Sequence, residues 1–106
     1  MDFGALKSLA IQLRHRLGTA GVHVDGVILY GSRASGRQRP DSDIDVAVLS
    51  RDFGKDRYAE GVLVNLHAHR VHADLEAVPI GLHEWFEPFP ASPLVHEIQM
   101  NGVFLI

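Results

Sequence analysis

The chain contains no cysteine among its 106 residues. It therefore forms no disulfide bond and offers no thiolate to a metal ion, and we expect it to work in the reducing cytoplasm. No apolar run approaches the ~20 residues that a helix needs to cross a bilayer. The N-terminal segment has Asp2 at its start and Lys7, Arg14 and Arg16 between its apolar positions, unlike an export signal. The sequence thus predicts a soluble, cytoplasmic protein.

Positive charge is also scarce. The 10 Lys and Arg residues are outnumbered by 13 Asp and Glu residues, which gives a formal net charge of -3. Because long nucleic acids are bound mainly through many phosphate contacts, this balance disfavours them as partners. Three of the cations, Arg33, Arg37 and Arg39, nevertheless lie close together in the chain. Such a cluster suits a small, highly charged anion.

The length of the chain predicts one domain that spans residues 1–106, and the spacing of its apolar residues predicts the helices and strands. Helices are expected over 3–17, 57–71 and 93–101, and strands over 22–30, 43–50 and 73–80. Ser92 is suited to the cap of the last helix, with Pro93 at its first position and Gly102 as its stop. The order helix, strand, strand, helix, strand, helix predicts an α/β fold, a small mixed β-sheet flanked by helices.

Two aspartates at alternate positions interrupt the second predicted strand. Residues two apart in a strand point to the same face, so Asp43 and Asp45 present paired carboxylates while Ile44 turns to the core. Like charges held this close repel each other unless a cation lies between them. Magnesium prefers carboxylate and phosphate oxygens, and two such ions can clamp a phosphoryl displacement. The pair is therefore a candidate metal site, to which Asp74 or Glu76 on the next strand could add a third carboxylate.

A Gly-Ser turn follows the first predicted strand. Gly31 lets a backbone approach phosphate oxygens without a Cβ in the way, and Ser32 adds a hydroxyl donor. The arginines that follow, Arg33 first among them, could form charge-assisted bonds to a triphosphate. These residues predict a loop that holds phosphates beside the aspartates.

Gly31-Ser32, ten further residues and then Asp43-Ile44-Asp45 resemble the signature of the DNA polymerase beta-like nucleotidyltransferase superfamily. The strings GSRASG and SDIDV are most similar to its minimal nucleotidyltransferases. The resemblance implies that superfamily's fold, with Asp43 and Asp45 as ligands of two Mg²⁺ ions and Gly31 and Ser32 at the nucleotide phosphates. Arg33 is expected to bind the nucleotide as well, because it is adjacent to Ser32. For the third catalytic and metal-binding carboxylate it favours Asp74, with Glu76 as the alternative.

The resemblance also implies an activity, the transfer of AMP from ATP to a hydroxyl with release of pyrophosphate. Minimal members of the superfamily often form toxin-antitoxin modules with a small helical HEPN protein, which they modify and silence. A HEPN-type toxin is therefore the expected partner and acceptor. Two alternatives stay open: a non-catalytic antitoxin that acts by contact alone, and a transferase for a small molecule such as an aminoglycoside.

Other patterns in the sequence favour less specific interpretations. GSRASGR misses the phosphate-binding loop of nucleoside triphosphatases, because Arg37 replaces its lysine. The spacings of His67, His69 and His72 do not match a helical zinc site, and a polar helix end explains them better. The aromatic residues Trp85, Phe86 and Phe89 could form either a partner surface or part of the core.

Overall fold

The computed structural model describes residues 1–37 and 43–106. The elements follow the order α1 (Phe3–Thr19), β1 (Gly26–Tyr30), η1 (Gly31–Arg33), β2 (Ile44–Ser50), α2 (Arg57–Val71), β3 (Leu75–Gly81), α3 (Leu82–Trp85), α4 (Pro93–Asn101) and β4 (Val103–Phe104). The four strands form one mixed sheet in the order β3-β2-β1-β4. This arrangement confirms the predicted fold class, a small mixed sheet with helices.

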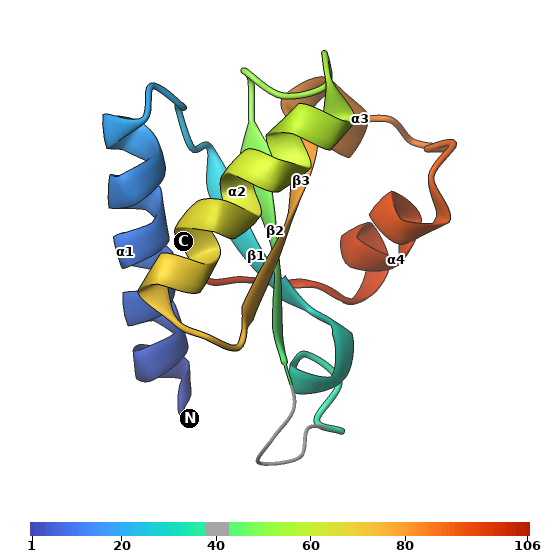
Figure 1. Cartoon of the computed structure of the whole chain (residues 1–106). Coiled ribbons are helices and arrows are strands. Elements are labelled where there is room, and N and C mark those ends of the chain that lie inside the picture. Colours follow the sequence, from blue (N-terminus) through green and yellow to red (C-terminus); the bar gives the residue numbers. More distant parts are fainter. Residues whose placement is uncertain (38–42) are drawn as a thin grey trace.

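Helices cover both faces of this sheet, with α1 and α2 on one side and α4 on the other (Figure 1). Alternate residues of β2 account for the two layers. Val46 and Val48 belong to the core under α1 and α2, which also contains Leu13 and Leu17 of α1. Ala47 and Leu49 point the other way and pack with residues of α4. The two-residue period of the strand thus separates two apolar cores.

Polar caps explain why the predicted helix boundaries agree so well with the structure. Asp2 accepts a hydrogen bond from the backbone nitrogen of Ala5 at 2.8 Å, at the start of α1. Ser92 caps α4, and Pro93 occupies its first turn. Side chains at these positions satisfy backbone N–H groups that have no partner within the helix. Within the described residues, no helix is both long and apolar enough to cross a bilayer.

The strand β3 lies at an edge of the sheet, and α2 protects part of that edge. The amide of Asn65, in the middle of α2, donates to the carbonyl of Ala77 at 2.7 Å and accepts from its N–H at 2.9 Å. These bonds satisfy backbone groups of an edge strand that would otherwise be free to pair with another chain. Pro79, also in β3, is tolerated for the same reason, because an edge strand does not need every donor.

The first strand begins later than predicted, because several kinds of contact hold residues 22–25. The N–H of Val22 donates to the carbonyl of Leu17 at 2.9 Å, the N–H of Asp25 donates to the carbonyl of Leu49 in β2 at 2.8 Å, and side chains hold His23. The N–H of His23 donates to the Asp52 carboxylate at 2.8 Å, and its carbonyl accepts from the Ser50 hydroxyl at 2.6 Å. Two short elements, α3 and β4, were not predicted. Trp85 of α3 packs edge-on against Phe104 of β4, with ring centroids 5.8 Å apart. Phe86 and Phe89 are exposed, so of the three aromatics only Trp85 packs against the core.

Candidate active site

The candidate catalytic residues meet at one end of the sheet, where β1 ends and β2 and β3 begin. Because β1 is antiparallel to β2, its last residue, Tyr30, lies opposite Asp45. Because β3 is parallel to β2, Glu76 lies beside Asp45 on the other side. Tyr30, Asp45 and Glu76 therefore form a row across three strands, on the face of the sheet that α4 covers.

The environment of this row disfavours negative charge. Burial raises the pKa of Asp45, and the nearby charges of Asp43 and Glu76 raise it further. Burial also raises the pKa of Tyr30 to about 12, with smaller contributions from Asp45 and Glu76. A carboxylate that is partly removed from water among other carboxylates is poorly stabilised, and a cation would relieve this repulsion.

The turn after β1 packs directly on this acidic group. Gly31 has a φ of 75°, a backbone conformation that favours glycine. A Cβ added at Gly31 would lie 2.6 Å from Oδ2 of Asp45, closer than such atoms approach each other. The Gly-Ser turn and Asp45, far apart in sequence, are thus in contact, and only glycine fits between them.

The loop that follows η1 folds back on itself. The N–H of Arg37 donates to the carbonyl of Ser32 at 2.9 Å, and the guanidinium of Arg37 donates to the hydroxyl of Ser35 at 2.9 Å. Nε of Arg33 donates to the carbonyl of Asp43 at 3.3 Å and so links the loop to the start of β2. Arg39, the third cation of the predicted cluster, lies outside the described residues, as do Asp41 and Ser42.

The two candidates for the third carboxylate occupy different positions. Asp74 is exposed in the turn before β3, where its carbonyl accepts a hydrogen bond from the N–H of Ile44 at 2.8 Å. Glu76 is half-buried within β3, beside Asp45. Its Oε1 also lies 3.2 Å from Nε2 of His69, in the last turn of α2. Sequence reasoning did not foresee this contact, because it depends on how α2 packs against β3.

A cavity of about 290 Å³ adjoins the Gly-Ser turn. Its walls come from Tyr30, the loop after it and α4, which contributes Glu97 and Asn101. Sequence reasoning also missed these two side chains. Their spacing places them on one face of α4, but only the packing of α4 brings that face to the Gly-Ser turn.

The candidate metal ligands at this site are carboxylate oxygens, which suit magnesium rather than a softer metal. In the described part of the chain, however, no group of three or more His, Asp or Glu side chains is arranged to enclose a metal ion. Magnesium commonly takes only one or two protein carboxylates and completes its shell with water and phosphate oxygens. The residues present therefore fit a magnesium ion that is held together with a bound phosphate.

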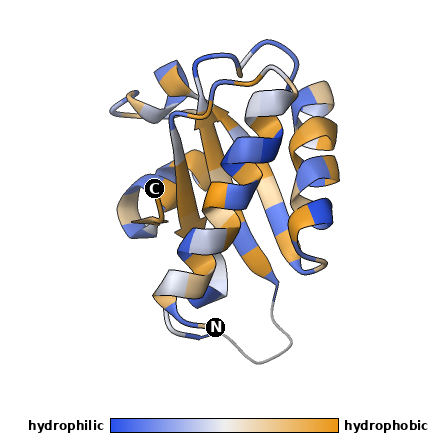
Figure 2. Cartoon of the chain, turned by 90° about the vertical axis from the view of Figure 1, so that its left-hand side faces the viewer, coloured by the Kyte–Doolittle hydropathy of each residue, from blue (hydrophilic) through white to orange (hydrophobic). Residues whose placement is uncertain are grey.

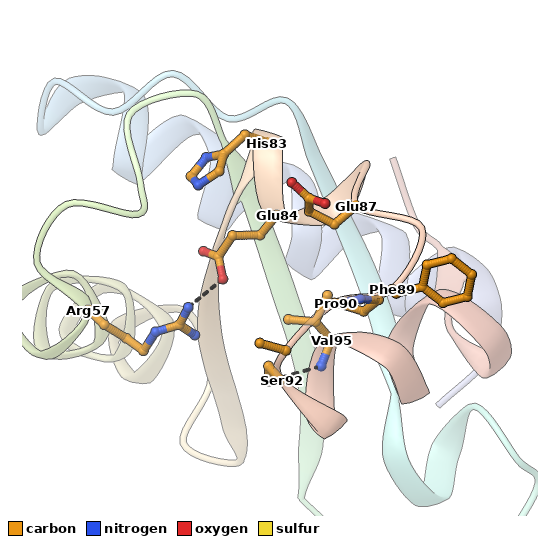
Figure 3. A pocket seen from close by; sticks show the side chains of 9 residues that line it. Arg57, His83, Glu84, Glu87, Phe89, Pro90, Ser92 and Val95 are labelled. Carbon is orange, nitrogen blue, oxygen red and sulfur yellow. Dashed lines mark hydrogen bonds and ion pairs between the residues drawn. The ribbon is translucent and has the colours of Figure 1, made fainter.

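A second hollow, of about 400 Å³, lies at the other end of the sheet, between the start of α2, α3 and the segment that leads to α4. In Figure 3, Arg57 and Glu84 form an ion pair across it, whereas Phe89 points away from it. Glu84 also accepts a hydrogen bond from the N–H of Gly81 at 3.1 Å. Arg57 and Glu84 thus neutralise each other in this hollow, unlike the carboxylates that gather around Asp45.

The fold is shared with solved structures of low sequence identity. A candidate nucleotidyltransferase from Sulfolobus solfataricus is similar with a TM-score of 0.64 and 14% identity, over 96% of this chain and 80% of that one. A chain of a toxin-antitoxin structure with AMP-PNP is similar with a TM-score of 0.63 and 22% identity, over 94% of this chain and 72% of that one. At these identities the likeness concerns the fold.

A comparison with the curated proteins finds no match to this sequence. The family described as "Polymerase beta, Nucleotidyltransferase" matches residues 15–105. This range contains the Gly-Ser turn, Asp43, Asp45 and Glu76, together with the four strands of the described sheet. The chain belongs to the polymerase beta-like nucleotidyltransferase family.

Proposed function

We propose that this protein is a magnesium-dependent nucleotidyltransferase that moves AMP from ATP to a hydroxyl group on a partner protein. The contact between Gly31 and Asp45 is the observation that carries the proposal. It joins a turn suited to phosphate with a carboxylate suited to a metal, at the sheet end where Glu76 also lies. A nucleoside triphosphate with its magnesium needs these two kinds of group side by side.

Asp43 and Asp45 would hold the magnesium together with oxygens of the bound phosphates, and Glu76 is our candidate for the third carboxylate of the site. We choose Glu76 over Asp74 because Glu76 lies beside Asp45 in the register of β2 and β3, and because its charge raises the pKa of Asp45. Asp74 precedes the strand and is exposed. When bound, magnesium would neutralise charge on the phosphates and on the oxygens that attack and leave.

The protein's own residues would position the substrate for an in-line displacement. Gly31, Ser32 and Arg33 would hold the β- and γ-phosphates. The hydroxyl oxygen of the acceptor forms a bond to the α-phosphorus, and the bond from that phosphorus to the bridging oxygen of the β-phosphate breaks. Pyrophosphate leaves with the electrons of that bond. The proton of the hydroxyl passes to a carboxylate of the site, for which Glu76 is well placed.

The choice of nucleotide and partner draws on a structural neighbour. The toxin-antitoxin structure of similar fold contains AMP-PNP, an analogue of ATP. That structure supports ATP as the donor and a toxin as the partner, with this chain as the antitoxin. The resemblance of GSRASG and SDIDV to minimal nucleotidyltransferases favours a helical, HEPN-type toxin as the acceptor. The exposed aromatic residues Phe86 and Phe89 offer apolar surface for such a contact.

The experiment uses ATP labelled on the α-phosphate, magnesium, and the purified product of the adjacent gene as acceptor. We expect label and one AMP of added mass on the acceptor. Asp45→Asn and Glu76→Gln should each reduce the transfer rate by at least about 100-fold, whereas Asp74→Asn should retain most of it. Glu87→Gln, at the far hollow, provides a control for the loss of one negative charge.

Two other outcomes would contradict the proposal. Equal activity of the wild type and the Asp45→Asn variant would show that the carboxylates have no catalytic role. If the wild type transferred no label, and the wild type, Asp45→Asn and Glu76→Gln all bound the acceptor tightly, the protein would instead neutralise its partner by contact alone.

A further inference from the structure

A groove of about 470 Å³ separates α1 from α2, on the face of the sheet opposite the row of Tyr30, Asp45 and Glu76. Figure 2 shows this side of the molecule, where the two helices lie next to each other in front of the sheet. The lining residues are Ile11, Gln12, His15 and Arg16 of α1 with Arg70 and Val71 of α2. The groove thus combines apolar walls with basic side chains, and none of the described residues that line it is a carboxylate.

The two arginines of the groove have no counter-ion in the described part of the chain. None of the ion pairs found there includes Arg16 or Arg70. Nε of Arg16 is buried and, among the described residues, makes no hydrogen bond. A buried donor without an acceptor costs the free energy of its lost hydration, so a ligand that supplies the acceptor would be stabilised there.

A third basic group lies beside the arginines. Nδ1 of His67, on the inner side of α2, is also buried without a hydrogen-bond partner among the described residues. Burial lowers the pKa of His67, and the charges of Arg16 and Arg70 lower it further. Arg16, Arg70 and His67 are thus close enough to influence one another, although His67 is not among the residues that line the groove. This basic group lies in a chain whose net charge is negative.

We propose that the groove between α1 and α2 binds a small organic phosphate. A phosphate monoester has three terminal oxygens and close to two negative charges, enough to bridge two guanidinium groups and still accept a bond from the imidazole of His15, which lines the groove. A carboxylate has one charge and two oxygens, and matches this set less well. The volume falls within the usual range for small-molecule sites, which leaves room for an organic group against Ile11 and Val71.

Three probes separate the contributions to binding: phenyl phosphate, benzoate and inorganic phosphate. Phenyl phosphate and benzoate share an apolar ring and differ in the anion, whereas inorganic phosphate lacks the ring. Titrations followed by the backbone NMR signals of the labelled protein should show shifts at Gln12, Arg16, Arg70 and Val71. We expect phenyl phosphate to bind at least about tenfold more tightly than either other probe.

Variants of the full chain test the arginines. Arg70→Gln and Arg16→Gln should each weaken phenyl phosphate binding by at least about tenfold. Arg14→Gln is the matched control, because Arg14 is exposed on the same helix but does not line the groove. The side chain of Arg70 is exposed, so its replacement keeps the test valid if Arg16→Gln destabilises the fold.

Several results would overturn the inference. These are the absence of shifts around the groove, benzoate binding as tight as that of phenyl phosphate, and an equal loss of affinity in Arg14→Gln. Because the groove between α1 and α2 does not depend on nucleotide transfer, the Asp45→Asn variant should bind phenyl phosphate as tightly as the wild type does. Failure of the groove and failure of the proposed activity are thus distinguishable.

Discussion

Gly31 lies so close to Asp45 that a Cβ on the glycine would stand 2.6 Å from Oδ2 of the carboxylate. The contact joins the end of β1 to the start of β2, and it determines the position of the carboxylate that forms the centre of the site. A substitution at Gly31 should therefore affect catalysis more than folding.

We predict that Gly31→Ala reduces nucleotide transfer by about 10- to 100-fold, because Asp45 must move away from the new methyl group. The loss of unfolding free energy should be only about 1 kcal/mol, the cost of a side chain at positive φ. Gly36→Ala is the control, since Gly36 has a φ of 76° but open space around it. Equal loss of activity in both variants would assign the effect to backbone strain rather than to Asp45.

The pKa of Tyr30 can show which carboxylate belongs to the row of Tyr30 and Asp45, without any assay of activity. Burial raises the pKa of Tyr30 to about 12, with help from Asp45 and Glu76. In a Tyr58→Phe background, Tyr30 is the one remaining tyrosine, and its ionisation can be followed by the ultraviolet absorbance of the phenolate. We predict that Glu76→Gln lowers this pKa, though not to its ordinary value, because the burial remains.

Asp74→Asn should leave the titration of Tyr30 unchanged in the same background. Circular dichroism recorded over the same pH range would confirm that the fold persists. If Asp74→Asn shifted the pKa as much as Glu76→Gln does, the assignment of Glu76 as the third carboxylate would be wrong.

A charge network at the far ends of β1 and β2 predicts how stability depends on pH. Asp25 accepts hydrogen bonds from the backbone N–H and from Nη2 of Arg51, each at 2.8 Å. The side-chain bond from Arg51 is the main cause that lowers the pKa of Asp25 below its ordinary value of 3.8. The stability that Asp25 contributes is thus present above pH 3.8 and is lost as the pH falls through the lowered pKa.

Asp25→Asn should accordingly lower the Tm at pH 7 by roughly 4 °C, a small effect because Arg51 is exposed to solvent. The difference in Tm from the wild type should shrink as the pH falls below 3.8. Thermal unfolding measured across this pH range checks both statements. A difference that stays constant with pH would show that Asp25 acts through packing or shape and not through its charge.

The sequence alone was sufficient for the elements that carry a long periodic pattern and clear end signals. The predicted ranges 57–71 and 93–101 coincide with α2 and α4. Both helices have a polar cap residue, Asp56 and Ser92, whose side chain accepts a backbone hydrogen bond within the first turn. Asp45 lies within β2 as the alternating pattern predicts, because alternation in a strand is a local property. Asp43, predicted as the first residue of that strand, directly precedes it.

Only the tertiary structure decided the relationships between elements. The strand β4 has two residues and α3 has four, too few for any period to be seen, and both depend on packing against their neighbours. In the sequence, Asp74 and Glu76 are equivalent, since both alternate with apolar residues. The parallel register of β2 and β3 distinguishes them, because it pairs Asp45 with Glu76 and leaves Asp74 outside the strand. Register depends on which strands become neighbours, and that is set by the packing of the whole chain.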